Sequence, residues 1–282
     1  MHGSQGCSTY IRRHISTHYN EPIDIASTSL SENDTVHGGS KNLLRGLDNV
    51  IKVYNPKVIG VLTTCLAETI GEDIKRIIYD YKTDRDLFDI DIIPLNTPGY
   101  GASHFEGYFQ AVKSVIKYFN PEKAVQNDKV NVIIPHMSCE DIRHIKQILD
   151  SFRLNYILLP DISDTLDAPY TNTYEKIPAG GAKAEDIRRM SGAKATIEMS
   201  MMIDECMSPG KYLRDEYDVP LHRCGIPIGI GATQRFLNIL SEISSLSIPD
   251  EYKLQRGRAL DGMIDSHKYN GEGRAAVFGD PE

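Results

Sequence analysis

The chain has 282 residues, of which 25% are charged and 40% hydrophobic, and its formal net charge is −8. This composition excludes a disordered chain, and an acidic balance without a basic stripe argues against a nucleic-acid partner. Because the sequence contains neither a long apolar run nor a signal peptide, we predict a soluble, cytoplasmic protein that does not bind membranes.

The first part of the chain alternates between helical and strand patterns. We predict strands at 23–27, 57–63 and 90–95, and helices at 11–22, 41–54, 68–81 and 105–119. A polar loop is expected from residue 27 to 34. This order is typical of a parallel sheet with right-handed crossovers. We therefore assign residues 1–125 to a first Rossmann-like domain.

The second part repeats the same style. We predict strands at 129–135, 156–159 and around Ile197 and Met199, and helices at 140–152, 184–190, 211–217, 232–245 and 250–268. The fold class is therefore α/β, with parallel sheets flanked by helices. Residues 126–272 form the second predicted Rossmann-like domain and its connecting helices. A strand at 274–279 would open a truncated third domain at 273–282, so we expect the chain to be a fragment.

Two cysteines stand out from a scattered set of five. An odd number of widely spaced cysteines does not indicate a disulfide framework, and most such thiols are buried and inert. Cys7 follows Gly3 and Gly6, which predicts a tight turn with the thiol at its tip. Cys65 stands at the carboxyl end of the strand at 57–63. Ligands of open α/β sheets bind beyond the carboxyl ends of strands, so we interpret the two thiols as one site.

Several chemistries compete for this site. The chain lacks both common glycine-rich phosphate-binding patterns, and the alternating glycines at 225–231 are a weak substitute. The spacing of Asp161, Asp164 and Asp167 does not match a calcium loop and favours a turn-rich segment. A nucleophilic cysteine would need a histidine base, and no spacing selects one among His2, His14, His18, His37 and His104.

Thiolate ligation of iron is the remaining chemistry. Thiolates hold iron–sulfur clusters, and small residues around them leave room for the inorganic core. Two cysteines are too few for a four-cysteine set. Cluster binding by Cys7 and Cys65 would therefore require ligands from another chain or from a segment outside this one.

An ordered set of motifs resembles the nitrogenase component I family, specifically its β-type subunits. The motifs run along the whole chain; they are His2–Cys7, Glu21-Pro22, Gly38-Gly39, Thr63–Asp73, Asn96-Thr97-Pro98, Pro160–Asp167, Pro227-Ile228-Gly229, Gln255–Arg258, Asp265-Ser266-His267 and Gly279-Asp280-Pro281. The set is specific because of its order, although each piece alone is not.

The resemblance implies three Rossmann-like domains in a full subunit. It also implies an α-type partner in a heterotetramer and an ATP-driven iron-protein reductase. A P-type or 4Fe–4S iron–sulfur cluster would be shared across the subunit interface, with Cys7 and Cys65 at ligand positions. Tyr10 falls on an aromatic position near the cluster, on the side that faces the reductase. The family's first β-side cluster cysteine lies upstream of the His2–Cys7 motif.

Two departures from the family pattern bear on the role. Catalytic β subunits have a serine where this chain has Gly99, and a phenylalanine docking residue where it has His37. Both favour the paralogue that serves as a scaffold for iron–molybdenum cofactor biosynthesis. Cys65 is retained here, whereas some scaffold subunits have lost it. The alternatives are a catalytic β chain that takes part in dinitrogen reduction, and a cluster-free interaction module.

Overall fold

The computed structural model describes residues 1–270, 276, 277 and 279, and its strands form two parallel sheets. The first sheet pairs β1 (Val58–Leu62) with β2 (Asp91–Leu95). The second sheet is parallel throughout, in the order β4 (Tyr156–Leu159), β3 (Val130–Ile133), β5 (Ala195–Met199) and β6 (Leu221–Cys224). The predicted α/β class with parallel sheets flanked by helices is confirmed.

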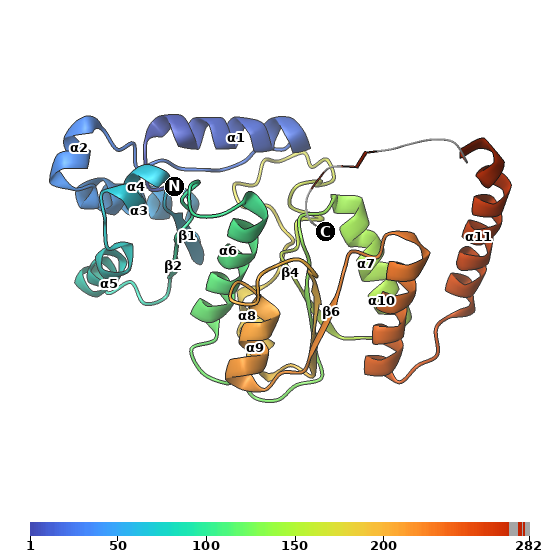
Figure 1. Cartoon of the computed structure of the whole chain (residues 1–282). Coiled ribbons are helices and arrows are strands. Elements are labelled where there is room, and N and C mark those ends of the chain that lie inside the picture. The colour runs from blue at the N-terminus through green and yellow to red at the C-terminus, as the bar shows by residue number, and fades with distance from the viewer. Residues whose placement is uncertain (271–275, 278, 280–282) are drawn as a thin grey trace.

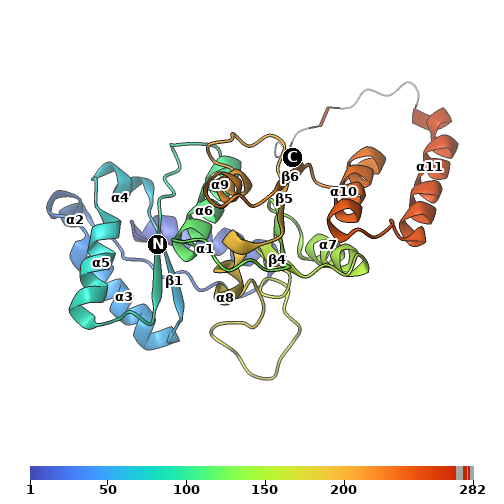
Figure 2. The same ribbon diagram turned by 90° about the horizontal axis from the view of Figure 1, so that it is seen from below.

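Helices connect the strands and cover both sheets (Figures 1 and 2). The helices are α1 (Gln5–Tyr19), α2 (Glu32–His37), α3 (Ser40–Tyr54), α4 (Cys65–Thr69), α5 (Ile74–Arg85), α6 (His104–Phe119), α7 (Cys139–Ser151), α8 (Ala184–Ile187), α9 (Pro209–Tyr217), α10 (Gly229–Ser244) and α11 (Asp250–Asn270). None of the described helices is long and apolar enough to cross a bilayer. In Figure 1, α11 stands apart from the sheets, beyond α10.

The first core lies between the two-stranded sheet and the pair α3 and α5. Leu43 and Leu47, four residues apart on α3, are both buried against Ile92 of β2 and its neighbours. Apolar residues at this spacing form one face of a helix, which is why the stretch folds as an amphipathic helix on the sheet. Ile78 and Tyr81 of α5 complete the same cluster.

Helix α6 joins the two sheets through one hydrophobic cluster. Phe109 and Ile116 are fully buried, and the cluster that contains them includes Leu95 of β2 together with Ile133 and Ile157 of the second sheet. A side chain of this size contributes about 1.5–3 kcal/mol when it is buried. Helices α7 and α10 supply the remaining core on the second sheet, with Leu149 and Phe236 among its buried residues.

The N-terminal region differs from the predicted elements. The helix predicted at 11–22 begins earlier, at Gln5, and ends at Tyr19. Residues 23–27 do not form a strand; the Ala26 carbonyl there accepts a hydrogen bond from the Met1 amine, and His2 forms the bridge to the first sheet. The loop predicted at 27–34 contains the start of α2, where Ser31 and Asp34 form a capping box. The hydrogen bonds of this capping box therefore start a helix where a loop was predicted.

Two further differences concern single elements. The helix predicted at 68–81 is divided into α4 and α5, and Gly71 between them has a φ of +74°, which a continuous helix does not allow. Strand β6 was not predicted, since its sequence Leu-His-Arg-Cys is too polar to suggest one. Of the strand predicted at 274–279, only residues 276, 277 and 279 are described, and none of them is in a strand; the rest lies outside the described residues.

The buried Tyr81 gives the first core a pH dependence. Burial and a 2.8 Å hydrogen bond from its hydroxyl to Asp48 raise the pKa of Tyr81 from 10.0 to about 12. The fold favours the protonated phenol, so this stabilisation is complete below about pH 10 and is lost as the pH rises to about 12. We expect the Tyr81→Phe variant to lose less unfolding free energy across this window than the unmodified chain.

Chemical denaturation at a series of alkaline pH values measures this effect. Tyr79 lies on the same helix and is 69% exposed, so the Tyr79→Phe variant serves as the control and is expected to keep the original pH slope. An equal pH slope in the Tyr81→Phe variant and the unmodified chain would contradict the assignment.

Candidate functional site

The first residues of the chain lie beside the carboxyl end of β1. His2 forms an isolated parallel bridge with Thr63, in which the His2 backbone N–H donates to Leu62 (2.7 Å) and Thr64 donates back to His2 (3.0 Å). Neighbouring strands lie about 4.8 Å apart, so the two segments leave this edge side by side. One segment reaches Cys7 five residues later, and the other reaches Cys65 two residues later.

Cys7 lies in the first turn of α1, not in the predicted tight turn. Gly6 is helical and nothing lies within 4 Å of a Cβ built on it, so the helix that begins at Gln5 does not depend on this glycine. The thiol is exposed and accepts a hydrogen bond from the Ser4 hydroxyl (3.4 Å). The start of a helix presents free N–H groups and attracts negative charge, which suits a thiolate ligand.

Cys65 opens α4 directly after β1, as predicted from its place at the end of a strand. Its thiol is exposed, and its sulfur accepts a hydrogen bond from the Gly99 backbone N–H (3.1 Å). The turn that carries Gly99 is fastened by Thr97, whose backbone N–H and hydroxyl bond to Thr63 (3.1 and 2.8 Å). The ends of β1 and β2 thus meet at Cys65, at the carboxyl edge of the sheet.

Glu68 connects the same strand ends from helix α4. One of its carboxylate oxygens accepts hydrogen bonds from the Thr63 hydroxyl and from the Asn96 side chain, the latter at 2.7 Å. Glu68 was not predicted to belong to the site. Its place three residues after Cys65, on the helix that the cysteine opens, is the feature of the sequence that could have indicated it.

The remaining cysteines lie elsewhere, and none of the five, all of which are described residues, is in a disulfide. Cys139 and Cys224 are buried, as predicted for most of the cysteines. Burial raises the pKa of the Cys139 thiol, which donates to the Ile162 carbonyl (3.5 Å). Cys206 is exposed, and its hydrogen bond with Asp204 raises its pKa. The environments of Cys139 and Cys206 therefore disfavour the thiolate form.

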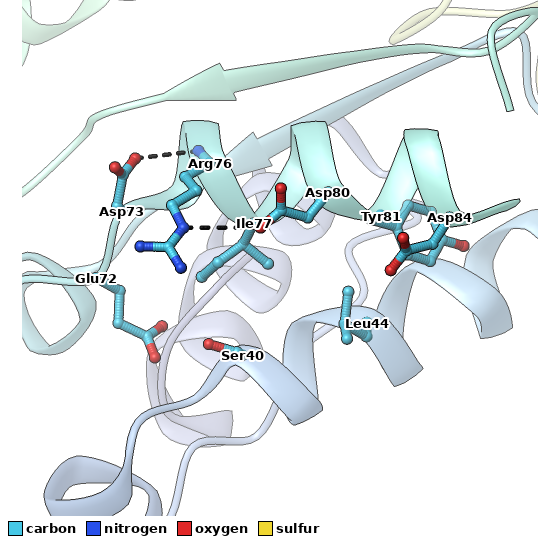
Figure 3. Close-up of a pocket in the computed structure, with 9 residues that line it drawn as sticks. All are labelled: Ser40, Leu44, Glu72, Asp73, Arg76, Ile77, Asp80, Tyr81 and Asp84. Carbon is cyan, nitrogen blue, oxygen red and sulfur yellow. Dashed lines mark hydrogen bonds and ion pairs between the residues drawn. The ribbon is translucent and has the colours of Figure 1, made fainter. Parts of the chain in front are cut away.

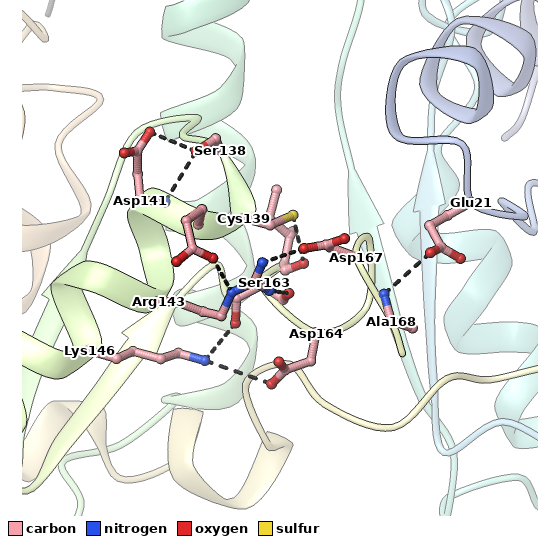
Figure 4. A network of polar contacts seen from close by, with 12 residues as sticks. Glu21, Ser138, Cys139, Asp141, Arg143, Lys146, Ser163, Asp164, Asp167 and Ala168 are labelled. Carbon is pink, nitrogen blue, oxygen red and sulfur yellow. Dashed lines mark hydrogen bonds and ion pairs between the residues drawn. The ribbon is translucent and has the colours of Figure 1, made fainter. Parts of the chain in front are cut away.

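The aspartates of the 160–178 loop face cations of α7, and Figure 4 shows Asp164 and Asp167 beside Lys146 and Arg143. Lys146 lies 2.6 Å from Asp161 and 3.9 Å from Asp164, and Arg143 pairs with Asp167. Asp161 also accepts hydrogen bonds from Ser163, in the manner of a turn. The Ser163 bonds to Asp161 are those expected of a turn-rich segment, and all three carboxylates have a cation within ion-pair distance.

The two exposed thiols suit one share of a metal cluster. Soft thiolate sulfurs at adjacent helix starts match the ligands that iron–sulfur clusters use. The buried hydroxyls of Ser8 and Thr64, each next to one of the cysteines, have no hydrogen-bond partner among the described residues. Within the described part of the chain, no group of three or more His, Cys, Asp or Glu side chains is arranged to hold a metal ion.

Tyr10 lies three residues after Cys7 on the exposed side of α1. Its ring is 63% exposed and stacks on His14, with ring centroids 6.4 Å apart. The side chain is therefore available at the surface near the thiols. The role implied for it by resemblance stays a prediction.

The family model and the curated relatives match the whole chain. A family model described as nitrogenase component 1 type oxidoreductase matches residues 1–282. The nitrogenase molybdenum–iron protein β chain of Clostridium pasteurianum is 33% identical over 282 residues, which are 100% of this chain and 61% of that protein. The β chain of Methanothermobacter marburgensis is 34% identical and is matched over 63% of its length.

Solved structures agree with these relatives. A chain of the nitrogenase Cp1 structure at pH 6.5 superposes with a TM-score of 0.89 at 34% identity, covering 95% of this chain and 58% of that one. A chain of the Cp1 structure at pH 5 shares 16% identity and has a TM-score of 0.66, which shows likeness of fold alone. The present chain spans less than two thirds of the length of each of these proteins.

Proposed function

Since the chain belongs to the nitrogenase component 1 type oxidoreductase family and is of the β type, we propose that Cys7 and Cys65 bind an iron–sulfur cluster at the contact with an α-type partner. The observation that carries the proposal is the pairing of His2 with Thr63. It brings two exposed thiols, distant in sequence, to one edge of the first sheet.

The chain's own contribution is to supply two thiolates and to stabilise their negative charge. The cluster, when bound, supplies one-electron transfer. The Gly99 N–H points at the Cys65 sulfur and stabilises negative charge on it, and hydrogen bonds to cluster sulfurs are among the determinants of reduction potential. The start of α1 acts in the same sense on Cys7.

We assign the subunit to a scaffold for iron–molybdenum cofactor biosynthesis in nitrogen fixation. A Cβ built on Gly99 would lie 3.4 Å from the Cys65 sulfur, so a side chain at this position would touch the ligand. The serine implied for catalytic β subunits would bring an oxygen ligand there, whereas glycine brings none. An α-type paralogue would complete the heterotetramer, and an ATP-dependent iron protein would supply electrons.

The catalytic β chain is the alternative, favoured by the names of the relatives, which are β chains of molybdenum–iron proteins. A cluster-free interaction module is the second alternative. In that case the exposure of both thiols and the hydrogen bond to Cys65 would have no chemical use.

Turnover and spectroscopy separate these functions. The chain is purified anaerobically with its α-type partner and assayed with the iron protein, ATP and a reductant. The scaffold assignment predicts an electron paramagnetic resonance signal from an iron–sulfur cluster, and no dinitrogen or acetylene reduction above background. Substrate reduction by the complex would contradict the scaffold role and support the catalytic one.

A further inference from the structure

We propose that the buried pair of His2 and Glu72 is a positioning device, which fixes the two cysteine-bearing segments relative to each other. The inference rests on the proposed function, since it concerns how the chain presents Cys7 and Cys65. Three segments meet at this pair: residues 1–3, residues 28–39 and residues 64–72. His2 precedes Cys7 by five residues, and Glu72 follows Cys65 by seven.

His2 is enclosed completely and uses both ring nitrogens. Its side chain has 0% exposure; Nδ1 lies 3.1 Å from the Thr28 hydroxyl, and Nε2 bonds to the Glu72 carboxylate. The Thr28 hydroxyl also accepts the Gly3 N–H at 3.0 Å. The ring therefore cannot rotate without breaking bonds to two other segments. It is also unavailable as a base for a cysteine nucleophile.

Glu72 connects this ring to the third segment. One carboxylate oxygen bonds to His2, and the other accepts the backbone N–H of Gly39. The side chain is 7% exposed and lines one end of an open pocket of about 360 Å³ between α3 and α5 (Figure 3). Gly71, with a φ of +74°, turns the chain after α4 and directs Glu72 back toward His2.

The surroundings leave little room for another arrangement. A Cβ on Gly39 would lie 2.4 Å from a terminal methyl group of the buried Leu30 and 3.1 Å from the His2 ring, so a larger residue would have to displace these side chains. The Gly3 backbone packs equally closely on Thr64. The hydrogen bonds of His2 and the backbone contact of Gly3 with Thr64 thus both hold the segments that carry Cys7 and Cys65.

The distance between two ligands of one cluster tolerates little error. Supporting residues must hold such groups to within about 0.5 Å, and loss of a supporting contact typically lowers metal affinity by about 10–100-fold. His2 and Glu72 do not face the metal in this account. They act through Cys7 and Cys65, by holding the segments from which the two thiols project.

The Glu72→Ala variant tests the device in the anaerobic complex with the α-type partner. It leaves the His2 Nε2 and the Gly39 N–H without their acceptor. The matched control is Asp48→Ala, which removes a carboxylate that bonds Tyr81 (2.8 Å) and Arg85 (3.1 Å) in the same helix pair but contacts neither cysteine segment. The Glu72→Gln variant keeps the side-chain volume, and its single amide oxygen accepts only one of the two bonds.

The readout is the chelator concentration that removes half of the iron that depends on Cys7 and Cys65, together with the paramagnetic resonance signal. We expect this concentration to fall by about tenfold or more for Glu72→Ala and by less for Glu72→Gln, with an altered signal in both. Asp48→Ala is expected to match the unmodified complex in both readouts. If Glu72→Ala does not fold, the comparison of Glu72→Gln with Asp48→Ala decides.

Iron retention and signal equal to those of Asp48→Ala in both Glu72 variants would overturn the inference and leave the proposed cluster intact. An unmodified complex without cysteine-dependent iron would overturn the proposed cluster itself, and this inference with it. The two failures are therefore distinguishable.

Discussion

Replacing Cys7 and Cys65 together with alanine is expected to remove the cluster from the complex. Both thiols are exposed at the starts of helices that leave one sheet edge, and the double variant removes both proposed ligands. Loss of supporting residues alone lowers metal affinity by about 10–100-fold, so loss of the ligands should exceed that range. Iron and acid-labile sulfide, measured after anaerobic purification, report the effect.

The fold should survive this double substitution. Both side chains are small and exposed, and surface replacements usually change stability by less than about 0.5 kcal/mol. Cys206→Ala is the matched control, because it removes another exposed thiol from a different part of the chain. The assignment fails if the double variant and Cys206→Ala retain equal amounts of iron.

The Gly3→Ala variant is expected to lose both stability and iron. A Cβ at this position would lie 2.0 Å from the Thr64 hydroxyl oxygen and 2.7 Å from its Cβ, closer than atoms can approach. Thr64 is buried and β-branched, so its side chain has little freedom to move away. Overpacking of this kind costs about 1–3 kcal/mol. The strain falls on the bridge between His2 and Thr63, which aligns the two cysteine segments.

Gly6→Ala provides the control within the same short motif. Nothing lies within 4 Å of a Cβ on Gly6, and the residue is in helix α1. Alanine there should be neutral or should stabilise by about 0.5–1 kcal/mol through helix propensity. Chemical denaturation and iron analysis of both variants compare the two glycines. Equal stability of Gly3→Ala and Gly6→Ala would contradict the close packing described for Gly3.

The elements that could be predicted from sequence are those set by local pattern. The apolar run at 57–63 and the periodic Leu43 and Leu47 gave a strand and a helix within a residue or two of β1 and α3. Cys65 was correctly placed at a strand exit for the same reason. In these stretches, hydrophobic periodicity and the packing of the folded chain favour the same structure.

The elements that could not be predicted depend on contacts distant in sequence. Residues 23–27 form no strand despite their β-branched pattern, and the Ala26 carbonyl accepts a hydrogen bond from the chain's terminal amine instead. The polar β6 is a strand because β5 offers it an edge, not because of its own sequence. Tertiary context overrides weak local preference in both cases.

In the candidate site, too, some residues could be predicted from local pattern and others could not. The two cysteines were selected from sequence, whereas their support was not. The Glu72 carboxylate lies 70 residues from the histidine it bonds, and Gly39 enters from a third segment. No spacing rule joins such residues. The motif at 2–7 suggested a glycine turn at Cys7, but Gly3 serves close packing on Thr64 and Gly6 lies inside helix α1.

The most direct test of cluster binding is the iron and acid-labile sulfide content of the unmodified chain, purified anaerobically with its α-type partner. We predict that the unmodified complex contains a stoichiometric excess of both elements over the Cys7→Ala/Cys65→Ala double variant of the same complex. Equal iron and sulfide in the two complexes would contradict the assignment of Cys7 and Cys65 as cluster ligands.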